Sequence, residues 1–73
     1  MGKRADATLQ HGLSDIEKEV LRLIALSYSN KEIATQLKIN VENVLLHKFD
    51  AMQKAGLCGR IDVIRYASNQ GWL

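Results

Sequence analysis

Two copies of one short pattern restrict what this chain can fold into. Ser14 is followed three residues later by Glu17, and Ser29 is followed three residues later by Glu32. Each pair forms a capping box, in which the serine and glutamate side chains satisfy backbone N–H groups at the start of an α-helix. Apolar residues recur at helical spacing behind both boxes, whereas no alternation with period two is long enough for a β-strand. The sequence therefore predicts an all-α fold.

The same periodicity predicts four helices. The first two begin at the capping boxes, Asn40 caps the third, and Gly56 supplies the left-handed residue that commonly ends a helix. The fourth helix begins near Arg60 and stops at Gly71, and Glu17 is expected on the outer face of the first. The residues expected to face the core are Ile16, Val20, Leu23, Ile24, Ile33, Ala34, Leu37, Val44, Ala51, Met52, Ala55, Ile61, Ile64 and Ala67, with Val63 beside the last three.

Length and composition exclude several classes of protein. A chain of 73 residues has room for one small domain, which we place at residues 13–73, after a flexible lead-in or linker remnant at residues 1–12. The longest apolar run, residues 23–26, is far below the ~20 residues of a membrane span, and the amino terminus lacks the apolar core of a signal peptide. We therefore expect a cytoplasmic protein without membrane contact. One cysteine and two histidines offer no arrangement for metal binding or nucleophilic catalysis, so we expect neither a cofactor nor an enzyme.

The second and third predicted helices are separated only by Lys38, Ile39 and Asn40. A short helix, a tight turn and a longer helix make up the helix-turn-helix motif, which places its second helix in the major groove of DNA. An ordinary helical hairpin in a small bundle has the same spacing, so the spacing leaves both interpretations open. The net charge of +2 permits an anionic partner without requiring one.

A specific hexapeptide, Ser-Asn-Lys-Glu-Ile-Ala, occupies residues 29–34. Other positions that match a known pattern in order are Leu13, Ser14, Glu19, Val20, Leu21, Leu23, Ile24, Ala25, Leu37, Ile39, Val44, His47, Lys54, Gly56, Arg60 and Ala67. Through residues 13–71 the chain resembles the LuxR/FixJ/NarL-type DNA-binding domain, and especially its small free-standing GerE-like members. The resemblance implies a bacterial regulator of transcription that binds double-stranded DNA as a dimer, with the third helix in the major groove. In that family the domain is usually attached to a phosphorylated receiver, as in response regulators, or to a ligand-sensing domain.

The resemblance also implies which residues contact DNA. Lys31 matches a phosphate-contacting lysine, and the N–H groups at the start of its helix would bind the same anion; the alternative is a solvated first-turn residue. Asn43 stands where the family has a threonine, and Leu45 stands where it usually has a lysine that reaches bases. The implied DNA-contacting residues are Lys31, Asn43, Leu45, Leu46, His47, Lys48, Phe49 and Lys54. The residues implied for a weak dimer through the fourth helix are Val63, Ile64, Tyr66 and Ala67.

A second function remains open because of three residues on the third helix. If the family's orientation holds, Leu45, Leu46 and Phe49 form one exposed apolar patch, and such patches commonly bind a partner. The alternative is therefore a helix-turn-helix scaffold that serves as a protein-interaction module with weak or lost DNA binding. A rotated third helix that buries one of the three side chains would remove the patch.

Three single residues carry expectations of their own. Ser27 replaces a usual glycine after the first helix, so it must accept an unfavourable φ or reshape the turn. His47 is expected either to be partly buried or to contact phosphate. Trp72 is expected to cover the edge of the fourth helix or a dimer seam.

Overall fold

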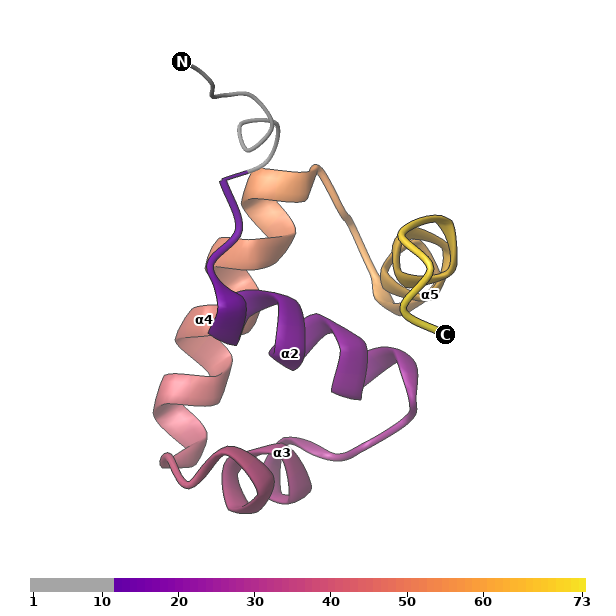
Figure 1. Ribbon diagram of the computed structural model, residues 1–73. Coiled ribbons are helices and arrows are strands. Elements are labelled where there is room, and N and C mark those ends of the chain that lie inside the picture. Colours follow the sequence, from indigo (N-terminus) through magenta and orange to yellow (C-terminus); the bar gives the residue numbers. More distant parts are fainter. Residues whose placement is uncertain (1–11) are drawn as a thin grey trace.

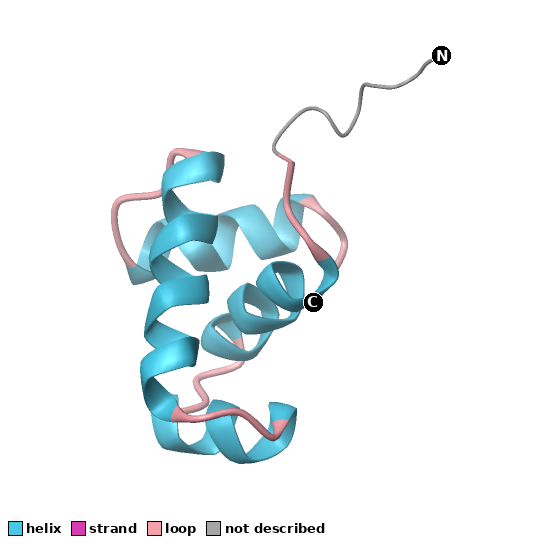
Figure 2. Cartoon of the chain, turned by 90° about the vertical axis from the view of Figure 1, so that its left-hand side faces the viewer, coloured by secondary structure: helices cyan, strands magenta, loops and turns pink. Residues whose placement is uncertain are grey.

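The computed structural model describes residues 12–73, so the predicted lead-in of residues 1–12 lies outside the described residues except for Gly12. Four α-helices and no strand occur in the described part, which confirms the all-α fold (Figure 1). The helices are α2 (Asp15–Ala25), α3 (Asn30–Leu37), α4 (Val41–Ala55) and α5 (Arg60–Asn69). Short loops connect them (Figure 2), and the turn between α3 and α4, residues 38–40, is the shortest of these connections.

The predicted caps fix three of the four helix starts. At α2, Ser14 Oγ accepts the Glu17 N–H at 3.2 Å, and Glu17 Oε1 accepts the Ser14 N–H at 2.9 Å. The equivalent bonds of the box that starts α3 measure 3.1 and 2.8 Å. At α4, Asn40 Oδ1 accepts the Asn43 N–H at 2.8 Å. Each cap satisfies donors that the first turn of a helix cannot satisfy itself, so the boundaries follow from local sequence.

Left-handed residues end two helices and shape one loop. Gly56, with φ of 70°, ends α4 as predicted, because glycine adopts this conformation without steric cost. Ser27 has φ of 75°, which confirms the predicted unfavourable backbone, and its Oγ accepts a hydrogen bond from the Arg60 guanidinium at 2.8 Å. Lys38 ends α3 with φ of 59°, a conformation that costs a non-glycine residue about 1–2 kcal/mol.

Helix α2 is the centre of the fold. It lies between α4 and α5 and also contacts α3, and α3 packs on α4 (Figure 1). The buried apolar residues are Val20, Leu21, Leu23, Ile24, Ile33, Ala34, Val44, Ala51, Val63 and Ala67. Most of the core therefore forms where α3 and α4, the two helices of the predicted helix-turn-helix, rest against α2, which fixes their mutual orientation.

The inner face of α5 agrees with the prediction at Ala67 and differs from it at Ile61 and Ile64. Val63 and Ala67 are fully buried, whereas Ile61 is 67% exposed and Ile64 is 37% exposed. Positions 61 and 64 are three apart and positions 63 and 67 are four apart, so both pairs have helical spacing. Periodicity alone could not choose between these pairs, and packing against α2 selects the second. Val63 and Ala67 are therefore core residues and cannot form a surface for a second copy of the chain.

Candidate nucleic-acid interface

The outward face of α4 carries the apolar residues that the sequence analysis singled out. Leu45 is 44% exposed, and Leu46 and Phe49 are each 60% exposed, so α4 is not rotated to bury any of them. The same helix buries Val44 and Ala51 on its opposite side against the core. We call Leu45, Leu46 and Phe49 the α4 apolar patch. Its position on the second helix of the helix-turn-helix is the position from which such a helix contacts base edges.

The polar residues implied for DNA contact lie around this patch. Lys31 and Asn43 are exposed in the first turns of α3 and α4, so both can reach an external phosphate. His47 and Lys48 are half-buried at the edges of the face of α4 that packs on the core. The half-buried position of His47 agrees with the first of its two expected environments, and contact of any of these residues with DNA stays a prediction.

Lys54 has a partner inside the chain. Its ammonium donates to both carboxylate oxygens of Glu17 at 3.0 Å and lies 3.5 Å from the carbonyl oxygen of Gly12. The Glu17 side chain is only 5% exposed, so the expectation that Glu17 lies on the outer face of α2 was wrong. The inward position has a physical reason, because the Ser14 N–H and the Lys54 ammonium both donate to a carboxylate that is removed from water. The Lys54 ammonium is thus held by Glu17 within the protein.

The electrostatics of Glu17 reflect the same contacts. Burial raises the pKa of this carboxyl, but the hydrogen bonds from Ser14 and from the Lys54 ammonium outweigh burial and hold the pKa below its ordinary value. The carboxylate is therefore charged in the folded protein, and it cancels the charge of Lys54. Of the remaining charged residues of α4, Glu42 and Asp50 are exposed and only Lys48 is basic. Helix α4 alone consequently offers little attraction to phosphate, and cations on other elements must supply it.

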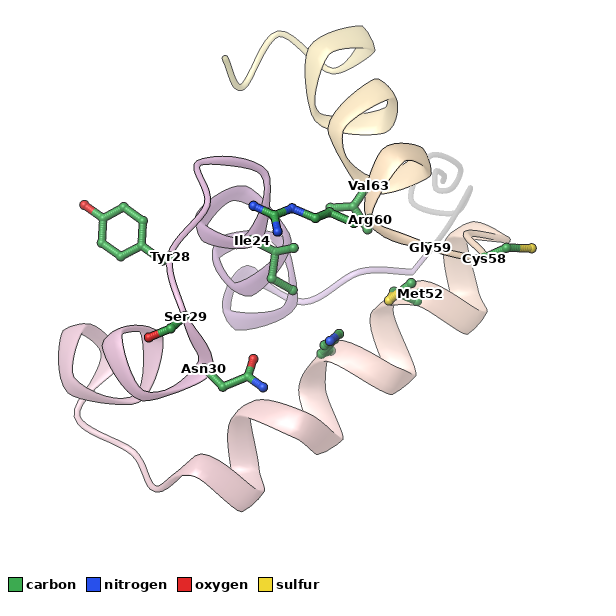
Figure 3. A pocket seen from close by; sticks show the side chains of 10 residues that line it. Ile24, Tyr28, Ser29, Asn30, Met52, Cys58, Gly59, Arg60 and Val63 are labelled. Atoms are coloured by element: carbon green, nitrogen blue, oxygen red, sulfur yellow. The ribbon is translucent and has the colours of Figure 1, made fainter.

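A cavity beside α4 (Figure 3) is lined by one such cation, Arg60 of α5, together with Lys48 of α4 itself. It has a volume of about 520 Å³ and lies between the α2–α3 loop, α4 and the start of α5. Its lining residues are Ile24, Tyr28, Ser29, Asn30, Lys48, Met52, Cys58, Gly59, Arg60 and Val63. Asn30 and Arg60 border it from opposite sides, whereas Tyr28 and Cys58 point away from it (Figure 3). The first turns of α3 and α5 both meet this cavity, and the start of a helix carries a partial positive charge.

The grouping of Lys48 with Arg60 was missed by the sequence analysis. The two residues lie on different helices, and only the turn at residues 56–59 brings the start of α5 beside the middle of α4. The hydrogen bond from Arg60 to Ser27 holds the guanidinium across the α2–α3 loop. The one local signal was Arg60 itself, a cation in the first turn of a helix, where acidic residues are usually favoured.

Two aromatic rings pack against each other at the carboxyl-terminal end of the domain. Tyr66 and Trp72 pack edge to face with ring centroids 5.5 Å apart, and burial raises the pKa of the Tyr66 hydroxyl. Trp72 therefore covers the edge of α5, as expected. Ile61 and Ile64 lie on the exposed side of α5, where the predicted dimer residue Ile64 is accessible and Val63 and Ala67 are not.

Comparison with known proteins decides the family. The sequence profile of the bacterial regulatory proteins, luxR family (GerE), matches residues 11–67, which is most of the chain. The chain belongs to the luxR family. The match confirms the predicted resemblance and the predicted class, a DNA-binding regulator of transcription, and this is not a family of enzymes.

Individual relatives of this luxR-family domain agree. The oxygen regulatory protein NreC of Staphylococcus aureus, in strains JH9, JH1 and USA300, is 46% identical over 55 residues. The aligned residues cover 75% of this chain and 25% of each NreC, so the chain spans about a quarter of the length of these relatives. No solved structure matches the chain.

Residues 12–73 of this luxR-family domain contain neither a membrane-spanning helix nor a metal-binding cluster. No helix in this range is long and apolar enough to cross a bilayer. Within the same range, no three His, Cys, Asp or Glu side chains are grouped so that they could hold a metal ion.

Proposed function

We propose that this luxR-family domain regulates transcription in the bacterial cytoplasm by inserting α4 into the major groove of double-stranded DNA. The observation that carries the proposal is the outward face of α4, which follows a tight turn after α3 and stands clear of the core. The family match favours this function over the alternative of a protein-interaction module without DNA binding.

Contacts to the DNA backbone come from a small set of cations. These cations are Lys31 in the first turn of α3, Lys48 on α4 itself and Arg60 at the start of α5, and the last two line the same cavity. Each phosphate neutralised by a cation contributes about 0.9 to the slope of log K against log salt for duplex DNA. With about three such contacts per domain, we expect a slope near −3 per domain and a modest affinity at physiological salt.

Assembly on DNA uses the exposed side of α5. Ile64 is accessible there, Ile61 lies one turn before it, and Tyr66 is half-buried nearby. One pair of short helices buries less than the ~1,200 Å² typical of stable interfaces, so we expect a weak homodimer that forms on paired half-sites.

The test is a titration of the 73-residue chain with labelled duplexes at several salt concentrations, read by fluorescence anisotropy. Lys31→Ala and Lys48→Ala should each weaken binding to every duplex and reduce the salt slope by about 1. The matched control is Lys18→Ala, because Lys18 is an exposed cation on α2 that does not line the cavity. Equal slopes in the parent and in both test variants, or no salt-dependent binding by the parent, would refute the proposed interface.

A further inference from the structure

The α4 apolar patch determines what the reading helix can recognise. Leu45, Leu46 and Phe49 carry only hydrocarbon side chains, and all three are exposed. None can donate or accept a hydrogen bond, whereas most base edges in the major groove present donors or acceptors. Thymine alone also presents an apolar group there, its C5-methyl.

Contact with other bases is unfavourable for a physical reason. A leucine or phenylalanine pressed against guanine displaces water from the N7 and O6 acceptors, and against cytosine it displaces water from the N4 donor. Polar groups that lose water without gaining a hydrogen-bond partner are penalised. Against thymine the same side chain instead removes two apolar surfaces from water.

We propose that this domain selects its DNA sites through thymine methyl groups, which pack against Leu45, Leu46 and Phe49. This inference rests on the proposed function, because it requires α4 to lie in the major groove. A residue four positions along a helix lies ~6 Å further along its axis. Since base pairs are spaced by 3.4 Å, Leu45 and Phe49 reach bases about two steps apart. The preferred half-site therefore contains two or three thymines within a few consecutive base pairs.

Uracil provides the direct test, because it differs from thymine only by the C5-methyl group. The preferred duplex is first selected from a random library with the 73-residue chain, and each thymine is then replaced singly by uracil. Burial of one carbon is worth about 0.8 kcal/mol, which corresponds to about a fourfold change in Kd. We expect about fourfold weaker binding at the thymines that face the patch and no change at the others. Replacement of one of those thymines by cytosine should also weaken binding. 5-Methylcytosine at the same position should recover part of the lost affinity, because it restores the methyl group.

Variants assign the effect to the patch. Leu45→Ala and Phe49→Ala should reduce the discrimination between thymine and uracil while leaving the salt slope unchanged, because no charge is altered. The matched control is Leu26→Ala, since Leu26 is a 45% exposed apolar residue at the end of α2 and lies outside the patch. It should retain the parent's discrimination.

The outcomes separate the two proposals. If binding depends on salt but its Kd is unchanged by uracil at every position, thymine reading is overturned and the proposed function remains intact. Absence of binding to any duplex would overturn both. A third outcome would identify the patch as a protein contact and also overturn thymine reading. In that case Leu45→Ala and Phe49→Ala lose self-association, measured by sedimentation, while their discrimination between thymine and uracil stays unchanged.

Discussion

Replacement of Lys54 by methionine tests whether this lysine belongs to the fold or to the DNA interface. Methionine keeps a long aliphatic side chain but removes the ammonium, so Glu17 loses two charge-assisted hydrogen bonds of 3.0 Å. Removing one partner of a fully buried ion pair costs about 3–5 kcal/mol. The Lys54 side chain is 44% exposed, and water therefore screens the pair. We expect the free energy of unfolding to fall by about 1–2 kcal/mol, well below the fully buried value.

Urea and thermal unfolding followed by circular dichroism measure this change. In a domain of this size, about 1 kcal/mol corresponds to about 4–8 °C in Tm, so the variant should melt about 5–15 °C lower. The loss should also depend on pH. Because the pKa of Glu17 is lowered in the folded state, its stabilisation is present above the unfolded pKa and disappears as pH falls through the folded pKa. The difference between parent and variant should accordingly shrink below about pH 4.5, the ordinary value for this carboxyl.

The matched control is the exposed ion pair of α2. The side chains of Arg22 and Glu19 are 38% and 40% exposed, so Arg22→Met should cost at most about 0.5 kcal/mol. A double-mutant cycle with Glu17→Gln isolates the coupling between Glu17 and Lys54. Unchanged stability of Lys54→Met, together with a salt slope of DNA binding reduced by about 1, would refute this reasoning and restore Lys54 to the DNA interface.

Other substitutions test single features of the structure. Lys38→Gly should raise the free energy of unfolding by about 0.5–1 kcal/mol in urea titrations, because glycine adopts the left-handed conformation at the end of α3 without strain. Asn40→Ala removes the cap of α4 and should lower the free energy of unfolding by about 1 kcal/mol in the same assay. Val63→Glu places an unpaired charge in the core and should unfold the domain, seen as loss of helical circular dichroism. Ile64→Glu should keep the helical spectrum and abolish cooperative binding to paired half-sites in gel shifts.

The parts of the fold that sequence could predict are those set by neighbouring residues. Ser14 and Glu17 are three positions apart, and so are Asn40 and Asn43, so the caps that start α2 and α4 depend on no distant contact. The left-handed backbone at Ser27 was predictable for the same reason. Local chemistry therefore gave the order of the helices and most of their boundaries.

The parts that sequence could not predict depend on distant contacts. Glu17 satisfies the requirements of a solvent-facing capping residue, and its burial follows from Lys54, 37 positions away. The orientation of α5 was ambiguous because Ile61 and Val63 each begin an apolar pair with helical spacing, and only packing on α2 separates them. For the candidate site, the exposure of the α4 apolar patch was predictable from the resemblance, whereas the cation cavity was not, because it is shared by three elements.

The central position of α2 has a consequence for how this domain can diversify. Helices α4 and α5 each pack extensively on α2 but barely touch one another. Away from the cavity that Lys48 and Arg60 share, substitutions on the outer faces of α4 and α5 are separated from one another, and the energies of such changes usually add. The outward side chains of α4 can therefore change during evolution without disturbing α5, and the outward side chains of α5 can change without disturbing α4. The same architecture makes the buried face of α2 the least tolerant surface, since α2 packs on α3, α4 and α5.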